Sequence, residues 1–383
     1  MKKYITLIAL FLGQGLTGTV ISLLTLISVL IGNSLSPYSF LSTLPITTTI
    51  LGSAIMAYLA SNIMEYYGRK KSFIIGGLIG LVGSLIAIIA IIYTNFILFC
   101  ASTFILGCST VFNQFYRFAA ADISNDPVFI KRSTSIIISG GILGGILGPY
   151  FAVKGIDLIE NFKFIGNFVL TSIIFLLLIF TQLFLSFKEK KIILNNSIAI
   201  VVRENVTEKF IIGTISCAVG FSLMTLIMNA APLSMHNHNY TVHDSSLALQ
   251  FHFFAMYSPS LILPFIIKKI KTNYLILVGS LCYMLGALFC FFSNNYLGYL
   301  VSLVCAGIGW AFMFNGGTFY LNEIKHTQNK HKLQGKSALI TYIANLIASF
   351  SIGALISMQY GWLLVNAIVI LFCVIFILIF NKL

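Results

Sequence analysis

The chain has 383 residues, of which 58% are hydrophobic and 9% are charged, and its formal net charge is +13. About a quarter of the residues in a soluble fold are charged, so this composition excludes a soluble protein and indicates one that lies in a lipid bilayer. One membrane-spanning helix with its connection needs roughly 30 residues, so the length allows about twelve to thirteen spans. It leaves no room for a separate catalytic or nucleic-acid-binding domain.

Twelve apolar segments are long enough to cross a bilayer. In chain order, we expect spans at 4–32, 38–64, 72–93, 95–121, 133–153, 164–187, 209–233, 246–267, 273–293, 296–321, 334–357 and 361–381. The first of them is longer than the apolar region of a signal peptide and is not followed by a small-residue cleavage site. We therefore expect it to be retained as the first span, and the fold to be an all-α membrane protein.

The basic residues predict the orientation of these spans. If the N-terminus is cytoplasmic, 21 of the 23 Lys and Arg residues fall in cytoplasmic segments, and only Lys154 and Lys163 fall on the other side. Cytoplasmic loops of membrane proteins carry such an excess of basic residues. The sequence therefore predicts a multi-pass protein with both termini in the cytoplasm. Nucleic acid is not an expected partner, because the basic residues are spread over short loops and form no aromatic-interleaved patch.

The chain divides into two halves that resemble each other. The longest polar interval, residues 188–208, separates six spans in residues 1–187 from six in residues 209–383. A shift of about 200 residues aligns Asp122 with Glu323, two of only ten acidic residues in the chain. An even number of spans gives both halves the same orientation, so we expect parallel repeats related by an axis along the membrane normal. The alternative is that cytoplasmic loops look alike only because all of them are basic.

A polar motif connects the second and third expected spans. It reads Ser61-Asn-Ile-Met-Glu65-Tyr-Tyr-Gly68-Arg69-Lys70-Lys71. A carboxylate at a helix end, a glycine that permits a tight turn and consecutive cations can pair with neighbouring helix ends and separate from them again. The motif resembles the signature of the major facilitator superfamily, in which a Gly leads to an Asp, a basic residue and then Gly-Arg-Arg/Lys. Here Ser61, Glu65 and Tyr66 depart from that pattern, whereas Gly68, Arg69 and Lys70 match it.

The resemblance implies a twelve-helix fold of two six-helix repeats with a cytoplasmic gate. In that family the motif closes the gate by pairing with the acidic end of span four and with the adjacent half. The expected gate residues are Glu65, Gly68, Arg69, Asp122 and, in the second half, Glu323. The alternative is that the cations of the motif only set the orientation. Five strings, YRFAAAD (116–122), APLSM (231–235), QFHFFAMYSPS (250–260), GIGWAFMFNGG (307–317) and LQG (333–335), resemble a subgroup of bacterial inner-membrane permeases that includes a riboflavin-uptake branch.

Polar side chains inside the expected spans are few, and they mark candidate solute contacts because they are costly in lipid and usually face the bundle interior. Spans one, four, seven and ten line the central cavity in the superfamily. This selects Gln14, Asn113, Gln114, Asn229 and Asn315 as candidate solute contacts. Each amide could instead make only an interhelical hydrogen bond of about 1 kcal/mol.

Three further side chains are candidate solute contacts. Arg117 could face an anionic solute, or it could snorkel to the interface or pair with Asp122. His252 could bind a proton near neutral pH and couple it to transport, or it could simply bond a neighbour. Trp310 offers a flat surface for an aromatic ligand. No Asp or Glu lies in the middle of an expected span, which argues against a carboxylate-based proton relay unless His252 or a carboxylate at a span end takes its place.

No cofactor or metal is expected. The seven cysteines all lie in apolar segments without CxxC spacing, which favours small apolar fillers. The segment 235–244 gathers three histidines and Asp244, which could bind Zn²⁺ or Cu²⁺ weakly but is more simply a polar loop. The chain has no Gly-x-x-x-x-Gly-Lys-Ser/Thr string for ATP, so transport has to draw on a gradient.

Together these patterns predict a monomeric secondary active or facilitative transporter, not an enzyme, in the bacterial cytoplasmic membrane. The resemblance implies rocker-switch alternating access for a small organic solute, with riboflavin-like and siderophore-like molecules among the candidates and a proton as a candidate coupled ion. One alternative is a transport-incompetent sensor or scaffold with a permease fold. A membrane enzyme acting on a lipid-linked substrate would need clustered acids, histidines or a nucleophile at one membrane face. The sequence leaves open the solute, the direction and the coupling ion.

Overall fold

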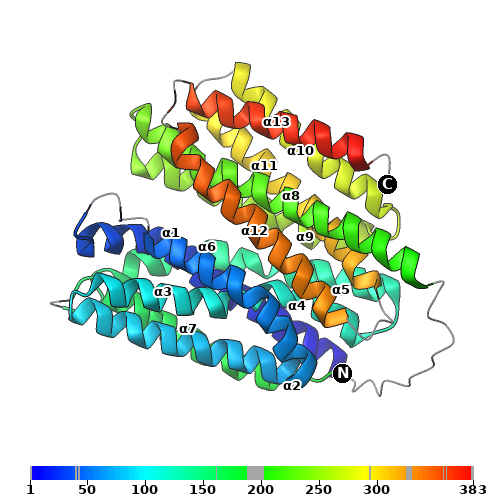
Figure 1. Ribbon diagram of the computed structural model, residues 1–383, viewed down its shortest axis with the longest axis horizontal. Helices are drawn as coiled ribbons and strands as arrows, with labels where there is room; N and C mark the ends of the chain where they lie inside the picture. The colour runs from blue at the N-terminus through cyan, green and yellow to red at the C-terminus, as the bar shows by residue number, and fades with distance from the viewer. Residues whose placement is uncertain are drawn as a thin grey trace. The chain divides into compact units, whose positions relative to one another are not determined.

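The computed structural model describes residues 2–38, 41, 44–160, 162–187, 202–292, 295–324, 330–356, 358 and 360–380. Within these ranges the regular structure is helical, with no strand (Figure 1). The helices are α1 (Lys2–Leu35), α2 (Leu44–Ile92), α3 (Phe96–Thr110), α4 (Asn113–Ile123), α5 (Pro127–Ser139), α6 (Gly141–Gly155), α7 (Ile165–Leu183), α8 (Val202–Asn237), α9 (Val242–Ile266), α10 (Thr272–Phe292), α11 (Tyr296–Glu323), α12 (Lys330–Ile356) and α13 (Gly361–Phe380). Residues 188–201 of the expected linker lie outside the described residues.

Eleven helical stretches in the described part of the chain are long and apolar enough to cross a membrane. Two of them join consecutive helices, α3 with α4 and α5 with α6. The stretch Leu44–Ile92 has 49 residues, which at about 1.5 Å per residue is more than twice the ~30 Å thickness of a bilayer core. The sequence predicts two spans where the structure has this one continuous stretch, and this difference accounts for a count of eleven instead of twelve.

Gly68 interrupts α2. Its backbone dihedrals are φ 76° and ψ 165°, outside the helical region, so two helices meet at this residue. L-residues with a side chain rarely adopt this conformation, which glycine reaches at little cost. Apart from its neighbours in the chain and the backbone of its own helix, no atom of the described residues lies within 4 Å of the place where a Cβ would stand. The backbone conformation, and not a lack of space, therefore requires glycine here.

The described contacts divide the chain into two compact units. Unit 1 comprises Met1–Ser124, Gly140–Glu189 and His331–Leu339, and unit 2 comprises Asn125–Ser139, Lys190–Lys330 and Ile340–Leu383. Two short segments thus belong to the unit that is built mainly from the other half of the sequence. Residues 125–139, which contain α5, belong to unit 2, and residues 331–339, near the start of α12, belong to unit 1.

Close backbone approach holds the helices of unit 1 together. A Cβ added to Gly107 in α3 would lie 2.0 Å from the carbonyl oxygen of Thr49 in α2. A Cβ added to Gly144 in α6 would lie 2.5 Å from the carbonyl carbon of Gly18 in α1. Small residues at such crossings let helix backbones approach and gain van der Waals contact, which favours helix association in lipid. Figure 1 shows α3 running beside α2 in this unit.

In unit 2, α11 contacts α5, α8, α9 and α10, and α8 contacts α9, α10, α11 and α13. Glycines again permit the approach. A Cβ on Gly309 would lie 2.6 Å from the Tyr283 ring in α10, and a Cβ on Gly317 would lie 2.6 Å from the carbonyl oxygen of Gly213 in α8. This arrangement places Trp310, Phe314 and Asn315 of α11 inside the unit.

Candidate functional site

Arg69 is the centre of a buried polar network in unit 1. It follows Gly68 in α2 and is only 4% exposed. Its Nε donates to Oδ2 of Asp122, near the end of α4, in an ion pair. Its Nη2 donates to Oε1 of Gln334 at 2.8 Å. Charge-assisted hydrogen bonds of this kind compensate a guanidinium for the loss of water. The network therefore joins three segments that are far apart in the sequence.

A second pair of contacts lies beside Arg69. Nζ of Lys332 is 3.5 Å from Oε1 of Glu65, and these two side chains are 43% and 35% exposed. A Cβ on Gly335 would lie 2.1 Å from Oγ of Ser61. The signature of the family named above has a Gly where this chain has Ser61, so here the small residue lies on the opposing helix. We call the set Glu65, Arg69, Asp122, Lys332 and Gln334 the Arg69 network.

Unit 2 contains a second ionic cluster, around Glu323 at the end of α11. Oε1 of Glu323 lies 3.2 Å from Nζ of Lys131, and Oε2 lies 3.0 Å from Nζ of Lys209. Nζ of Lys131 also donates to Oγ1 of Thr272 at 3.0 Å, and Nε of Arg132 donates to the carbonyl oxygen of Pro264 at 2.9 Å. We call Lys131, Arg132, Lys209 and Glu323 the Glu323 network. It fastens the segment 125–139 within unit 2, as the Arg69 network fastens the segment 331–339 within unit 1.

Two amides in unit 1 lie where the helix of the expected fourth span changes pitch. The amide N–H groups of Gln114 and Phe115 donate three residues back, to Val111 and Phe112, at 3.0 Å each. Such a tightened turn within a span often marks a functional site. Oδ1 of Asn113 and Oε1 of Gln114 are buried and accept no hydrogen bond from the described residues. A buried acceptor without a donor is costly, so these two oxygens could accept hydrogen bonds from a solute.

Arg117 and Gln14 are also buried in unit 1. Arg117 is 1% exposed, its Nε donates to the carbonyl oxygen of Gln114 at 3.1 Å, and its guanidinium lies 4.5 Å from the Phe118 ring centroid. Gln14 is 8% exposed on α1, which packs against α4. The structure therefore brings Gln114 and Arg117 together and places Gln14 on a neighbouring helix.

Among the candidates in unit 2, Asn315 has both ends of its amide hydrogen-bonded, whereas Nε2 of His252 and Nε1 of Trp310 are buried without a partner among the described residues. Asn315 is fully buried, its Nδ2 donates to Oγ of Ser260 at 2.8 Å, and its Oδ1 accepts from Oγ of Ser135 at 3.2 Å. His252 is also fully buried, and its Nδ1 lies 2.6 Å from the carbonyl oxygen of Leu303. A carbonyl only accepts, so Nδ1 carries the proton of this bond. Asn229 is half-buried in α8. Asn315 and His252 thus fasten α9 to α11.

Trp310 stands among other aromatic rings on α11. It is 3% exposed, and its ring stacks on Phe314 with centroids 4.6 Å apart and an interplanar angle of 19°. Tyr257 and Phe221 meet Trp310 edge-on, at 5.5 Å and 6.3 Å. Tyr342 lies 6.4 Å from Phe221. We call these five residues the Trp310 cluster.

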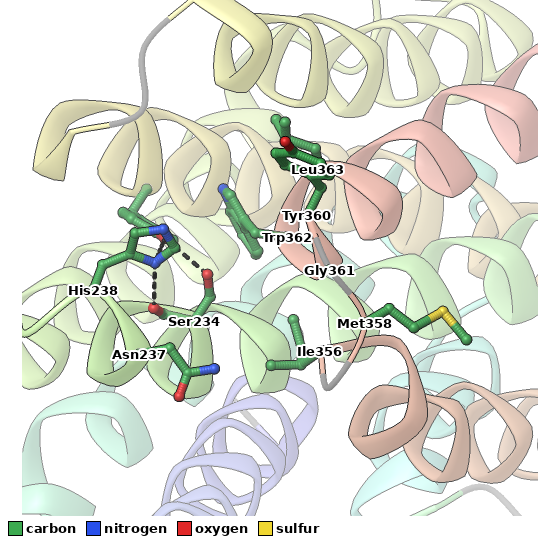
Figure 2. A pocket seen from close by; sticks show the side chains of 10 residues that line it. Ser234, Asn237, His238, Ile356, Met358, Tyr360, Gly361, Trp362 and Leu363 are labelled. Atoms are coloured by element: carbon green, nitrogen blue, oxygen red, sulfur yellow. Dashed lines mark hydrogen bonds between the residues drawn. The ribbon is translucent and has the colours of Figure 1, made fainter.

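A cavity of about 360 Å³ lies elsewhere in unit 2 (Figure 2). Its wall contains Tyr299, whose Oη lies 2.8 Å from Oγ of Ser234 and 3.1 Å from Nδ1 of His238. The Tyr299 ring also lies 4.9 Å from the ring of Trp362. Three polar side chains of this wall, those of Ser234, His238 and Tyr299, therefore lie within hydrogen-bond distance of one another or of the backbone. Among the described side chains, which do not include those of His236 and His243, no group of His, Cys, Asp or Glu could hold a metal ion.

Several partners of the predicted residues are absent from the sequence-based candidates. Gln334 and Lys332, which bond to Arg69 and Glu65, come from a segment that the sequence marks only by the string LQG. Lys131 and Lys209 were expected to be orientation signals, and they pair with Glu323. An ion-pair partner has no sequence signal of its own when most loops are basic.

Comparisons with known proteins agree with this architecture. The sequence model of the Major Facilitator Superfamily matches residues 6–349. The chain is similar to the riboflavin transporter RfnT of Brucella anthropi, with 28% identity over 346 residues that cover 89% of this chain and 86% of that protein.

Solved structures of transporters share the fold. The human organic anion transporter MFSD10 superposes with a TM-score of 0.78 at 13% identity and 99% coverage of each chain. FucP in the outward conformation gives a TM-score of 0.71 at 14% identity and 98% coverage of each chain. Since the family match spans most of the sequence, the chain belongs to the Major Facilitator Superfamily of membrane transporters.

Proposed function

We propose that this chain is a secondary transporter that moves a flavin-like solute across the bacterial cytoplasmic membrane by alternating access. The observation that carries the proposal is the Arg69 network. The residues of the signature motif are bonded there to Asp122 and to Gln334, as expected for a closed gate. The network holds a buried charge with a segment from the other half of the sequence, which is the arrangement that a gate between two halves requires.

The Arg69 network can act as a two-state gate. Residues 331–339 belong to unit 1, whereas residues 340–356 of the same helix belong to unit 2. Any movement of unit 2 that carries α12 with it has to break the bonds of Gln334 and Lys332. A buried guanidinium is costly unless it is either hydrogen-bonded to a counter-charge or hydrated. The Arg69 network therefore has two stable states, and structural elements with two discrete states serve as switches.

The Glu323 network is the proposed counterpart in the second half. Residues 125–139 belong to unit 2, while α6, which follows directly, belongs to unit 1. Each unit therefore holds a short segment that continues into a helix of the other. We propose that both networks belong to the cytoplasmic gate, and that they form and break in the same step of transport.

The membrane arrangement follows from the same residues. We propose that α2 crosses the membrane twice and turns at Gly68, which gives twelve spans in two parallel repeats, residues 1–187 and 209–383. Both termini then lie in the cytoplasm, as the basic residues indicate. The proposed working form is a monomer.

The flavin-like solute is proposed from the similarity to a protein named as a riboflavin transporter. A flavin has a planar ring with carbonyl groups and a polyhydroxylated chain. The buried oxygens of Asn113 and Gln114 could accept hydrogen bonds from such hydroxyl groups. The other proposed contacts are Gln14, Arg117, Asn229, His252, Trp310 and Asn315.

Reconstituted vesicles test this proposal. Purified chain in proteoliposomes should accumulate or equilibrate unaltered riboflavin with saturable kinetics, and an imposed pH gradient should change the rate if a proton is coupled. The Arg69→Ala variant should lower the rate at least tenfold while its abundance in the membrane is kept. Chemical conversion of the solute would favour an enzyme. If riboflavin is neither moved nor converted, the proposed cargo is wrong and a sensor is favoured.

A further inference from the structure

The Trp310 cluster brings together five aromatic side chains from four helices of unit 2. Phe221 comes from α8, Tyr257 from α9, Trp310 and Phe314 from α11, and Tyr342 from α12. Aromatic side chains that face lipid would be exposed on the surface of the unit. Here Trp310 is 3% exposed and Phe314 is 4% exposed, so the cluster lies inside the unit.

The indole N–H of Trp310 has no hydrogen-bond partner in the described part of the chain. Its Nε1 is buried, and no acceptor lies within reach among the described residues. Buried tryptophan N–H groups usually find a partner, because leaving a donor unpaired forfeits the bond it made to water. Pure packing would be served as well by phenylalanine, which has no such donor. The orphaned donor therefore leaves a place for an acceptor from outside the described residues.

The rings around Trp310 define the shape of the missing partner. The Trp310 and Phe314 planes differ by only 19°, whereas the Tyr257 and Phe221 rings stand at 80° and 68° to the indole. Parallel and perpendicular faces together suit a flat ring, which stacks on one and meets the edge of another. Phe221, Tyr257 and Tyr342 are half-buried, so the cluster is not closed on all sides.

From these contacts we infer that the Trp310 cluster is a subsite for the planar heteroaromatic ring of the solute, with Trp310 Nε1 donating a hydrogen bond to a ring carbonyl or ring nitrogen. The inference rests on the proposed transport function and makes it more specific. It assigns the ring of the solute to unit 2 and leaves its polar chain to other contacts. A flavin ring has both the flat shape and the acceptor atoms that this subsite requires.

Binding measurements with three probes test the assignment. The probes are riboflavin, lumiflavin, which keeps the ring without the polyhydroxylated chain, and ribitol, which resembles the chain without the ring. The purified full-length chain should bind lumiflavin within about tenfold of riboflavin, and ribitol should not compete with either. Trp310→Phe keeps an aromatic ring but removes the donor. It should weaken both flavins by about tenfold, as expected for one lost hydrogen bond.

The chain contains a matched control. It has two tryptophans, and Trp362 lies beside Tyr299 in the separate cavity of Figure 2. Trp362→Phe should leave the affinity for lumiflavin unchanged. If Trp310→Phe does not elute as a folded protein, Phe221→Leu provides a second variant, which should also weaken lumiflavin severalfold.

The two failures are distinguishable. If the wild-type chain binds riboflavin and Trp310→Phe binds it equally well, the subsite is wrong and the transport proposal stands. If the wild-type chain binds neither riboflavin nor lumiflavin, the flavin-like cargo is wrong, and this assignment falls with it. Equal losses in Trp310→Phe and Trp362→Phe would also overturn the subsite, since they would indicate a general loss of packing.

Discussion

A shift of about 200 residues aligns Asp122 with Glu323, but the structure holds these two acids in different ways. The Asp122 side chain is 19% exposed, and it pairs with Arg69, whose side chain is 3% exposed. Glu323 pairs with two lysines, and its side chain is 30% exposed. Arginine suits buried pairing because its guanidinium is planar and weakly hydrated, whereas a lysine ammonium is a strongly hydrated point charge. The two acids therefore differ in the chemistry and the burial of their partners.

This comparison predicts that the Arg69 network is the stronger of the two. Breaking a buried pair by removing one partner costs about 3–5 kcal/mol, because a charge is left uncompensated. Exposed pairs contribute only about 0–1 kcal/mol. If both networks belong to one gate, the gate should depend far more on unit 1 than on unit 2.

The largest effect is expected from Asp122→Asn, which leaves the Arg69 guanidinium buried without its counter-charge. The free energy that holds the closed gate should fall by about 3 kcal/mol. Thermal unfolding of the purified chain should show a clear drop in midpoint, and riboflavin uptake should fall more than tenfold. Glu323→Gln is the matched control. Equal losses in the two variants would contradict the difference between the networks.

Gly335→Ala should have the next largest effect. The added Cβ would lie 2.1 Å from Oγ of Ser61, so the start of α12 would be pushed away from α2. Overpacking of this kind costs about 1–3 kcal/mol. Adding Ser61→Gly to the same chain removes the clashing hydroxymethyl group and should restore uptake.

The double variant tests whether the steric clash causes the loss of uptake. Ser61→Gly alone should have a mild effect, because it only removes a contact. If the double variant transports no better than Gly335→Ala, then the clash with Ser61 is not the cause of the loss.

Glu323→Gln should cost less than about 1 kcal/mol, because water screens its lysine partners. The loss of uptake should be small at low ionic strength and should disappear near 1 M salt, where the screening length is about 3 Å. Uptake measured over a salt series checks this. A large loss of uptake that does not depend on salt would contradict this prediction. It would indicate that the ion pairs of Glu323 are shielded from water, like the pair of Arg69.

The smallest effect is expected from Lys332→Ala. Nζ of Lys332 is 3.5 Å from Glu65, and the side chains are 43% and 35% exposed. Uptake should stay within about twofold of the wild-type rate, since the median exposed pair adds almost nothing to stability. If Lys332→Ala lowers uptake nearly as much as Asp122→Asn, the pair of Lys332 with Glu65 contributes more to the gate than we expect.

The apolar segments and the Gly68–Arg69 motif were sufficient to predict an all-helical membrane fold, the family and the acid that pairs with Arg69. The sequence predicts that the second span ends at residue 64, whereas the helix continues up to Gly68. Hydropathy locates the apolar part of a helix, and the polar residues that follow contain no helix breaker before Gly68. The sequence also could not show which of Asn113 and Asn315 has its hydrogen bonds satisfied within the protein. The two amides have the same chemistry, but Asn315 finds Ser260 and Ser135, while Oδ1 of Asn113 accepts no bond from the described residues.

Aromatic residues posed a similar difficulty. The chain has 34 Phe and 17 Tyr, so composition gives no means of choosing the few that surround Trp310. Side chains facing lipid and side chains facing a buried site are equally apolar. Only the fold shows which ones converge from α8, α9, α11 and α12. That the N–H of Trp310 meets no acceptor among the described residues is likewise a property of its surroundings and not of its residue type.

The contact between Ser61 and Gly335 also affects how related sequences should be compared. The two positions share one volume, so what matters is their combined size and not the identity of either residue. A relative that has glycine at position 61 is free to carry alanine or serine at position 335. We therefore expect the two sites to covary, and a search that demands glycine at the first site alone would pass over chains that made the exchange.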